Sequence, residues 1–199
     1  MRVTSSSQWC PIPNDLDASE VAVLLATYLP ALRILRHGTP STGRRRRRRR
    51  VLISYDIPTP LTTALARLAK IELGCRDVQT STPCSSSAAP FDMVIDFGGH
   101  WQTDIPRPQK TPVICCRSLS SAWDDLVERS KLTFTPYASL YDINASRVAP
   151  RPEEISHLLD LLQRRRIRPE IQQYVSLEEL SGLPQHPTSG VVVCEPWKE

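Results

Sequence analysis

The sequence lacks the short motifs by which several enzyme classes are recognised. Its 199 residues contain no G-x-S-x-G, no HExxH and no Walker-type phosphate loop. Those motifs supply a nucleophile, a zinc site and a phosphate cradle, so the hydrolase and nucleoside-triphosphatase classes have no support. The six cysteines form no CxxC pair, and none of the four histidines has a Cys or Asp partner at metal spacing. This pattern predicts reduced thiols in a cytoplasmic protein and no metal site.

The sequence also lacks a recognisable secretory leader or membrane-spanning segment. The start, MRVTSSSQWCPIPND, has no apolar core of the kind found in signal peptides. The apolar stretch from Val21 to Leu35 is shorter than the roughly 20 residues of a span, and it contains Thr27, Tyr28 and Pro30. We therefore expect no membrane attachment.

Basic charge is concentrated in one place. The chain has 25 basic and 21 acidic residues, and seven of the basic ones are Arg44 to Arg50. Without this run 18 basic residues face 21 acidic ones, a net charge of −3. Nucleic-acid binders usually spread Lys and Arg over a whole face, with aromatic residues between them. The run is interpreted as a solvated, disordered insertion at 39–50, with nuclear import or a nucleic-acid contact as the alternative.

Apolar segments alternate with amphipathic ones along the chain. Strands are expected at 51–54, 77–81, 91–99, 111–116 and 190–196, with an extended piece at 132–139. Helices are expected at 17–38, kinked or split at Pro30, and at 61–74, 120–131 and from Pro152 onward. This alternation predicts an α/β fold: a reduced, Rossmann-like, mostly parallel sheet flanked by helices. Residues 1–16 are expected to form a linker-like segment, and 17–199 the domain.

Four segments, in their order along the chain, match the pattern of a known family. They are ARLAK (Ala66–Lys70), FDMVIDFGG (Phe91–Gly99), RRRIRPEIQQYVSLEEL (Arg164–Leu180) and SGVVVCEP (Ser189–Pro196). Together they resemble the cofactor-binding half of the medium-chain dehydrogenase/reductase superfamily, nearest its quinone-oxidoreductase and enoyl-reductase branch. The family has a further helix and strand where this chain has only TPCSSSAAP, so the resemblance implies a sheet with about one strand fewer.

The resemblance implies an NADPH site with an altered phosphate turn. The family's three turn glycines, which allow a tight turn and close approach to the pyrophosphate, fall here on Tyr55, Pro58 and Leu61. Pro58 and Pro60 lack an N–H, and Asp56 adds negative charge beside a phosphate. We therefore expect weak or absent NADPH binding. The residues implied to contact the cofactor are Tyr55, Asp56, Thr59, Thr80, Ser81, Gly98 and Gly99.

In this family most catalytic contacts come from a separate β-rich N-terminal domain, for which this sequence shows no counterpart. No catalytic residue is therefore assigned. The sequence indicates a truncated, degenerate NAD(P)H-dependent oxidoreductase-like protein of the quinone or enoyl reductase type, inactive alone. One alternative is a non-enzymatic interaction module that forms a homodimer through a sheet edge supplied by TPVICC. Another is a nucleic-acid or nuclear accessory protein that uses the Arg run.

Overall fold

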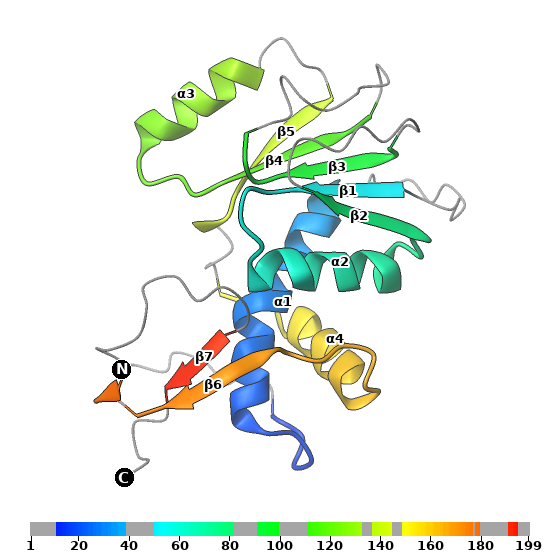
Figure 1. Ribbon diagram of the computed structural model, residues 1–199, viewed down its shortest axis with the longest axis vertical. Coiled ribbons are helices and arrows are strands. Elements are labelled where there is room, and N and C mark those ends of the chain that lie inside the picture. The colour runs from blue at the N-terminus through cyan, green and yellow to red at the C-terminus, as the bar shows by residue number, and fades with distance from the viewer. Residues whose placement is uncertain are drawn as a thin grey trace.

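Five described strands form one parallel sheet in the order β2-β1-β3-β4-β5. The computed structural model describes residues 11–38, 50–81, 91–99, 111–132, 137–144, 149–176, 178–179 and 191–194. The strands are Arg50–Ser54 (β1), Asp77–Ser81 (β2), Met93–Asp96 (β3), Val113–Arg117 (β4) and Ala138–Asp142 (β5), as Figure 1 shows. The predicted fold class, α/β and Rossmann-like, is confirmed.

The strand order is that of a Rossmann sheet from which one outer strand is missing. The full six-stranded sheet has the order 3-2-1-4-5-6. The five strands here follow the same order without the first position, because no strand lies beyond β2 among the described residues. This agrees with the expectation that the sheet has about one strand fewer.

In the described part of the chain four helices accompany the sheet: Ala18–Gly38 (α1), Pro60–Glu72 (α2), Ala122–Leu132 (α3) and Pro152–Gln163 (α4). Successive residues of a strand point to opposite faces. Val51 and Ile53 accordingly join the large core formed with α1, α2 and α4, whereas Leu52 joins a smaller cluster on the other face. In Figure 1 α1 and α2 lie on one side of the sheet and α3 on the other.

Helix α1 continues through Pro30 as one helix of 21 residues, so the expected split is not found. By length and composition it is the one described helix that could cross a membrane, which corrects the expectation that the apolar stretch is too short. Residues Leu24, Ile34 and Leu35 are nevertheless almost fully buried inside the protein. Such burial is typical of a core helix, so the length of α1 is not in itself a sign of a membrane span.

Two details of the sequence interpretation are wrong. Arg50 is not part of an insertion but the first residue of β1, where its Nε lies 2.8 Å from Asp77 Oδ2 and its guanidinium 5.2 Å from the centre of the Phe91 ring. Residues 39–49 lie outside the described part. The TPVICC segment is not a sheet edge either, because β4 lies between β3 and β5. Strand β5, which begins within the extended piece expected at 132–139, pairs along the outer side of β4.

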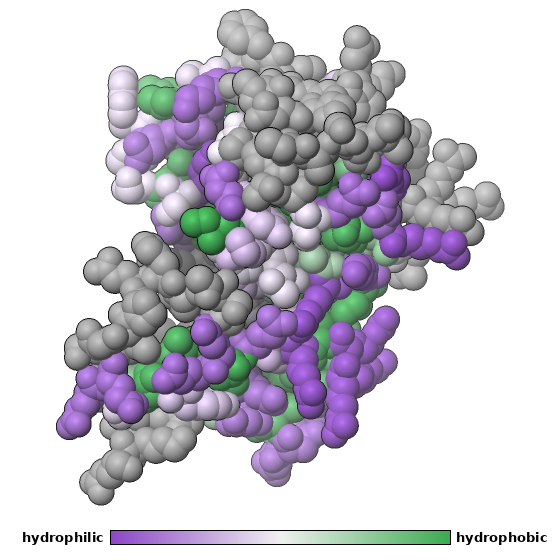
Figure 2. All heavy atoms as spheres, viewed as in Figure 1, coloured by the Kyte–Doolittle hydropathy of each residue, from purple (hydrophilic) through white to green (hydrophobic). Residues whose placement is uncertain are grey.

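A second, small sheet contains Ile171–Val175 (β6) and Val191–Cys194 (β7), which run parallel to each other. The apolar run of β7 was expected as a strand. The sequence IQQYV of β6 was not expected as a strand, because its polar and apolar residues do not alternate. The pairing of β6 with β7 is also irregular, between Ile171 and Gln173. On the face seen in Figure 2, hydrophilic side chains predominate around α4, and the apolar patches are small and separated.

Candidate functional site

The carboxyl ends of β2, β1 and β3 meet at one edge of the sheet. Ser54, the last residue of β1, is in register with Ser81 on one side and with Asp96 on the other. The strand order reverses at β1, because β2, the next strand along the chain, lies on one side of β1 and β3 lies on the other. Open α/β sheets bind ligands outside the carboxyl ends of their strands at such a switch point.

The residues predicted to contact a cofactor all lie along this edge. Tyr55, Asp56 and Thr59 belong to the connection from β1 to α2, where Tyr55 is half-buried and the other two are exposed. Thr80, which is exposed, and Ser81 end β2. After β3, Gly98 is half-buried, and Gly99 has a φ of +86° that favours glycine. The fold thus brings the predicted residues to one edge, whereas their role as contacts stays a prediction.

The N-terminus of α2, which follows the altered phosphate turn, is capped by its own threonines. Thr59 is the N-cap residue: its Oγ1 accepts from the Thr62 N–H at 3.3 Å, and its carbonyl accepts from the Thr63 N–H at 3.1 Å. In return the Thr59 N–H donates to Thr62 Oγ1 at 2.9 Å. Pro60 at the first helical position has no N–H at all. The backbone donors of this first turn are therefore largely used within it.

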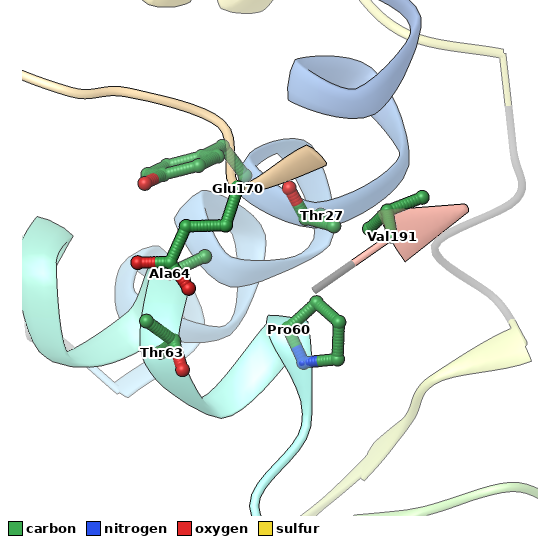
Figure 3. A pocket seen from close by; sticks show the side chains of 7 residues that line it. Thr27, Pro60, Thr63, Ala64, Glu170 and Val191 are labelled. Carbon is green, nitrogen blue, oxygen red and sulfur yellow. The ribbon is translucent and has the colours of Figure 1, made fainter. Parts of the chain in front are cut away.

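A small hollow lies beside the same helix end, between α1, α2 and the second sheet. Figure 3 shows its lining, which includes Thr27, Pro60, Thr63 and Glu170. The hollow has only about 10 Å³ of space, roughly the room that one water molecule needs. Glu170 contributes a carboxylate to its wall and forms an ion pair with Arg67. A phosphate would not fit into that space, and the Glu170 carboxylate would repel it.

These observations decide how well the site fits the dinucleotide that the fold implies. A pyrophosphate is normally held by unpaired N–H groups at a helix N-terminus. At α2 the N–H groups of Thr62 and Thr63 already have partners, and Pro58 and Pro60 supply none. Pro58 takes one of the family's glycine positions, and the side chain of its neighbour Ile57, with 69% of its surface exposed, also stands in this turn. The β1–α2 turn therefore does not fit a dinucleotide pyrophosphate held in the usual way.

The polar centre of the edge lies instead at the ends of β3 and β4. Asp96 has no exposed surface, and its Oδ2 accepts from Arg117 Nη2 at 3.1 Å and from the Gly99 N–H at 2.9 Å. Arg117 Nη1 donates to three backbone carbonyls, those of Asp96, Phe97 and Cys116. The pair thus satisfies a buried carboxylate with a cation and fixes the orientation of the guanidinium.

Two further groups beside this pair bear on its chemistry. The Ser54 hydroxyl is buried and has no hydrogen-bond partner in the described part of the chain. The Cys116 thiol is also buried, and burial raises its pKa well above the ordinary range, so it stays protonated and is not a nucleophile. The described residues include no group of three His, Cys, Asp or Glu able to hold a metal ion.

Sequence reasoning missed Ser54, Asp96 and Arg117. A signal was present, because each is a polar residue at the carboxyl end of an otherwise apolar strand: VLIS, MVID and VICCR. Strands buried on both faces are mostly apolar, so a polar residue at their carboxyl end departs from the pattern that packing requires and is a candidate for a functional role. What the pattern could not show is that Asp96 and Arg117 pair with each other, which depends on β3 and β4 being neighbours.

Comparison with known proteins finds likeness in structure but not in sequence. No family model matches the chain, and neither does any curated protein. A cobalt- and zinc-bound alcohol dehydrogenase from Pyrobaculum aerophilum is similar over 92% of this chain and 58% of its own, with a TM-score of 0.60 and 16% identity. The CurK enoyl reductase is similar over 90% and 62%, with a TM-score of 0.55 and 16% identity.

A third similar structure was solved with a bound nucleotide. It is an acetophenone reductase from Geotrichum candidum in complex with NAD, similar over 87% of this chain and 53% of its own, with a TM-score of 0.51 and 11% identity. The chain spans less than two thirds of these structures. At such identities the likeness establishes the fold alone, the Rossmann-like α/β fold that these dehydrogenases and reductases share and that the sequence resemblance implied.

Proposed function

We propose that the chain is a degenerate cofactor domain of the NAD(P)H-dependent oxidoreductase type, which binds NADPH weakly and is inactive alone. The observation that supports this is the self-capped N-terminus of α2. Thr59 and Thr62 use each other's donors and acceptors at the place where such a fold normally receives a pyrophosphate. The likeness to dehydrogenases and reductases supports the oxidoreductase origin of the fold.

A titration tests the proposal. Purified protein is titrated with NADPH while nucleotide fluorescence is followed, and no saturation is expected in the low-micromolar range. In a matched variant, Pro58→Gly/Pro60→Gly, the turn regains two N–H donors, and we expect tighter binding. Thr80→Ala serves as the control, because it removes a hydroxyl from the same edge without changing the turn. Low-micromolar binding by the unmodified protein would contradict the proposal.

The absence of turnover is tested separately. Hydride transfer requires the nicotinamide to be held against its acceptor with water largely excluded. Asp96 and Arg117, the charged groups at the ends of β3 and β4, are paired with each other. NADPH oxidation is measured by absorbance with a range of quinones and α,β-unsaturated ketones. Activity clearly above that of a heat-inactivated control, and reduced by Thr59→Ala, would show that the site works.

A second candidate function, an interaction module, rests on the outer side of β5, with which no described strand pairs. This strand is the last in the sheet order, and its residues ASLYD include no Pro or Lys, the residues that commonly protect an edge from pairing. We propose that two copies pair along β5. Hydrogen exchange should then slow at the β5 amides as protein concentration rises, together with a doubling of mass in sedimentation. A monomer at all concentrations would exclude this arrangement.

A further inference from the structure

A groove of about 360 Å³ lies at the end of β4 against α3. Its lining contains an aromatic ring, Trp123, the apolar side chains of Leu119 and Val127, the Ser118 hydroxyl and the charged pair Arg117 and Glu128. The Asp124 carboxylate also lines it and accepts hydrogen bonds from Ser120 and Ser121. The volume is in the range of small-molecule sites, which are typically mostly apolar with a few convergent polar groups. Helix α3 forms one wall and has no buried residue of its own, so this wall is open to a ligand.

The Arg117 guanidinium is held so that only part of it can face a ligand. Its Nη1 donates to the carbonyls of Asp96, Phe97 and Cys116 at 3.1, 3.2 and 2.8 Å, and its Nη2 donates to the buried Asp96 carboxylate. Its Nε lies 3.6 Å from Glu128 Oε2, which is too far for a hydrogen bond. Arg117 Nε and Glu128 Oε2 are therefore paired by charge, without a hydrogen bond between them.

The surroundings keep this pair in place. The Leu119 N–H donates to Asp142 Oδ1 at 3.3 Å, and Asn144 Nδ2 donates to the Leu119 carbonyl at 2.9 Å, so the loop after β4 is tied to the end of β5. Glu128 is held from the other side, because Lys131 Nζ donates to its Oε1 at 2.5 Å. Both polar groups are thus positioned before any ligand arrives.

Trp123 supplies a stacking surface on the same groove. It has 69% of its surface exposed although it lines the groove, which leaves its ring accessible. Exposed aromatic rings stack planar bases. A purine or pyrimidine base presents, on one edge, an acceptor beside an N–H donor. Such an edge could accept from Arg117 Nε and donate to Glu128 Oε2, while the ring lies on Trp123. Arg117 and Glu128 cancel each other's charge, and Asp124 adds a carboxylate to the lining, so the groove suits an uncharged ring rather than an anion.

We infer that this groove binds a purine or pyrimidine base, with Arg117 and Glu128 reading its hydrogen-bonding edge and Trp123 stacking on its ring. This goes beyond the proposed function and does not depend on it, because no residue of the β1–α2 turn takes part. The site binds the base alone, so it requires neither a phosphate nor a nicotinamide.

Calorimetric titration with inosine tests the inference, and 1-methylinosine is the matched ligand because a methyl group replaces only its N1–H. We expect inosine to bind and 1-methylinosine to bind at least about tenfold more weakly, since a hydrogen bond to a carboxylate is lost. Glu128→Gln and Trp123→Ala should each weaken inosine binding roughly tenfold or more. Leu126→Ala, on the same helix and 57% exposed but outside the groove lining, is the control and should bind normally.

Three results would overturn the inference. They are no binding of inosine up to its solubility limit, equal binding of the two ligands, and binding that survives both Glu128→Gln and Trp123→Ala. Circular dichroism of each variant shows whether it is folded. Because α3 has no buried residue, all three substitutions on it are expected to leave the fold intact. Failure here leaves the NADPH titration unaffected, so the two proposals are tested apart.

Discussion

Replacing Gly38, the last residue of α1, is predicted to destabilise the fold because Gly38 packs closely against the sheet. A Cβ added there would lie 2.2 Å from Ile114 Cδ1 and 3.3 Å from Met93 Cε. Carbon atoms in contact normally lie about 3.5 Å apart or more, so the Ile114 methyl group would have to move by roughly 1.3 Å. Ile114 and Met93 are 1% and 2% exposed, so there is little room for that movement.

The expected cost of Gly38→Ala follows from two opposing terms. Overpacking a core costs about 1–3 kcal/mol, while Ala in place of Gly favours a helix by up to about 1 kcal/mol. We therefore expect a net loss of roughly 1–2 kcal/mol in the free energy of unfolding, mainly through packing. Ile114→Val removes the obstructing Cδ1 and costs about 1 kcal/mol alone. The double variant should be more stable than the sum of the two losses predicts.

Urea unfolding followed by far-ultraviolet circular dichroism measures these free energies. Gly74→Ala is the control, since Gly74 has a φ of +61° and no atom within 4 Å of an added Cβ. It should lose roughly 1 kcal/mol through backbone strain, and Ile114→Val should not reduce that loss. The packing argument is refuted if Gly38→Ala is as stable as the unmodified protein, or if the double variant shows the simple sum.

Three further predictions concern other parts of the chain. Arg165 has a φ of 54° in the turn that ends α4, where its N–H donates to the Leu162 carbonyl and that of Arg166 to the Leu161 carbonyl, so Arg165→Gly should gain about 1 kcal/mol in thermal unfolding; Arg164→Gly, at φ −74°, should gain nothing. The hydrogen bond from Arg33 lowers the pKa of the buried Glu154, so the pair stabilises fully above the unfolded pKa, and the advantage over Glu154→Gln should disappear as the pH falls through the folded pKa; an advantage that persisted at pH 2 would contradict this. Replacing Arg44 to Arg49 with Gly and Ser should leave the melting temperature nearly unchanged and remove most of any salt-sensitive nucleic-acid binding, whereas a large loss of melting temperature would mean that these residues are paired within the fold.

The local order of the chain was readable from the sequence because it depends on near neighbours. Apolar runs such as VLIS and VICC predicted buried strands, and Pro152 predicted the first turn of a helix, as the structure shows. The missing glycines of the β1–α2 turn were visible in the same way. They indicated an altered turn before α2, although only the structure shows that Thr59 and Thr62 cap each other.

Tertiary structure decided what depends on contacts between distant segments. Whether β4 or β5 forms the edge follows from the pairing of residues 113–117 with 138–142, and neither sequence shows it. Arg50 belongs to β1 rather than to the insertion. Its side chain pairs with Asp77 and lies over the ring of Phe91, and both of these residues come later in the chain. The pairing of Asp96 with Arg117, and the groove that this pair shares with Trp123, likewise arise only when two parallel strands end side by side. The spacing of apolar residues indicates which residues are buried, whereas the residues that each of them contacts depend on how the helices and strands pack in the whole fold.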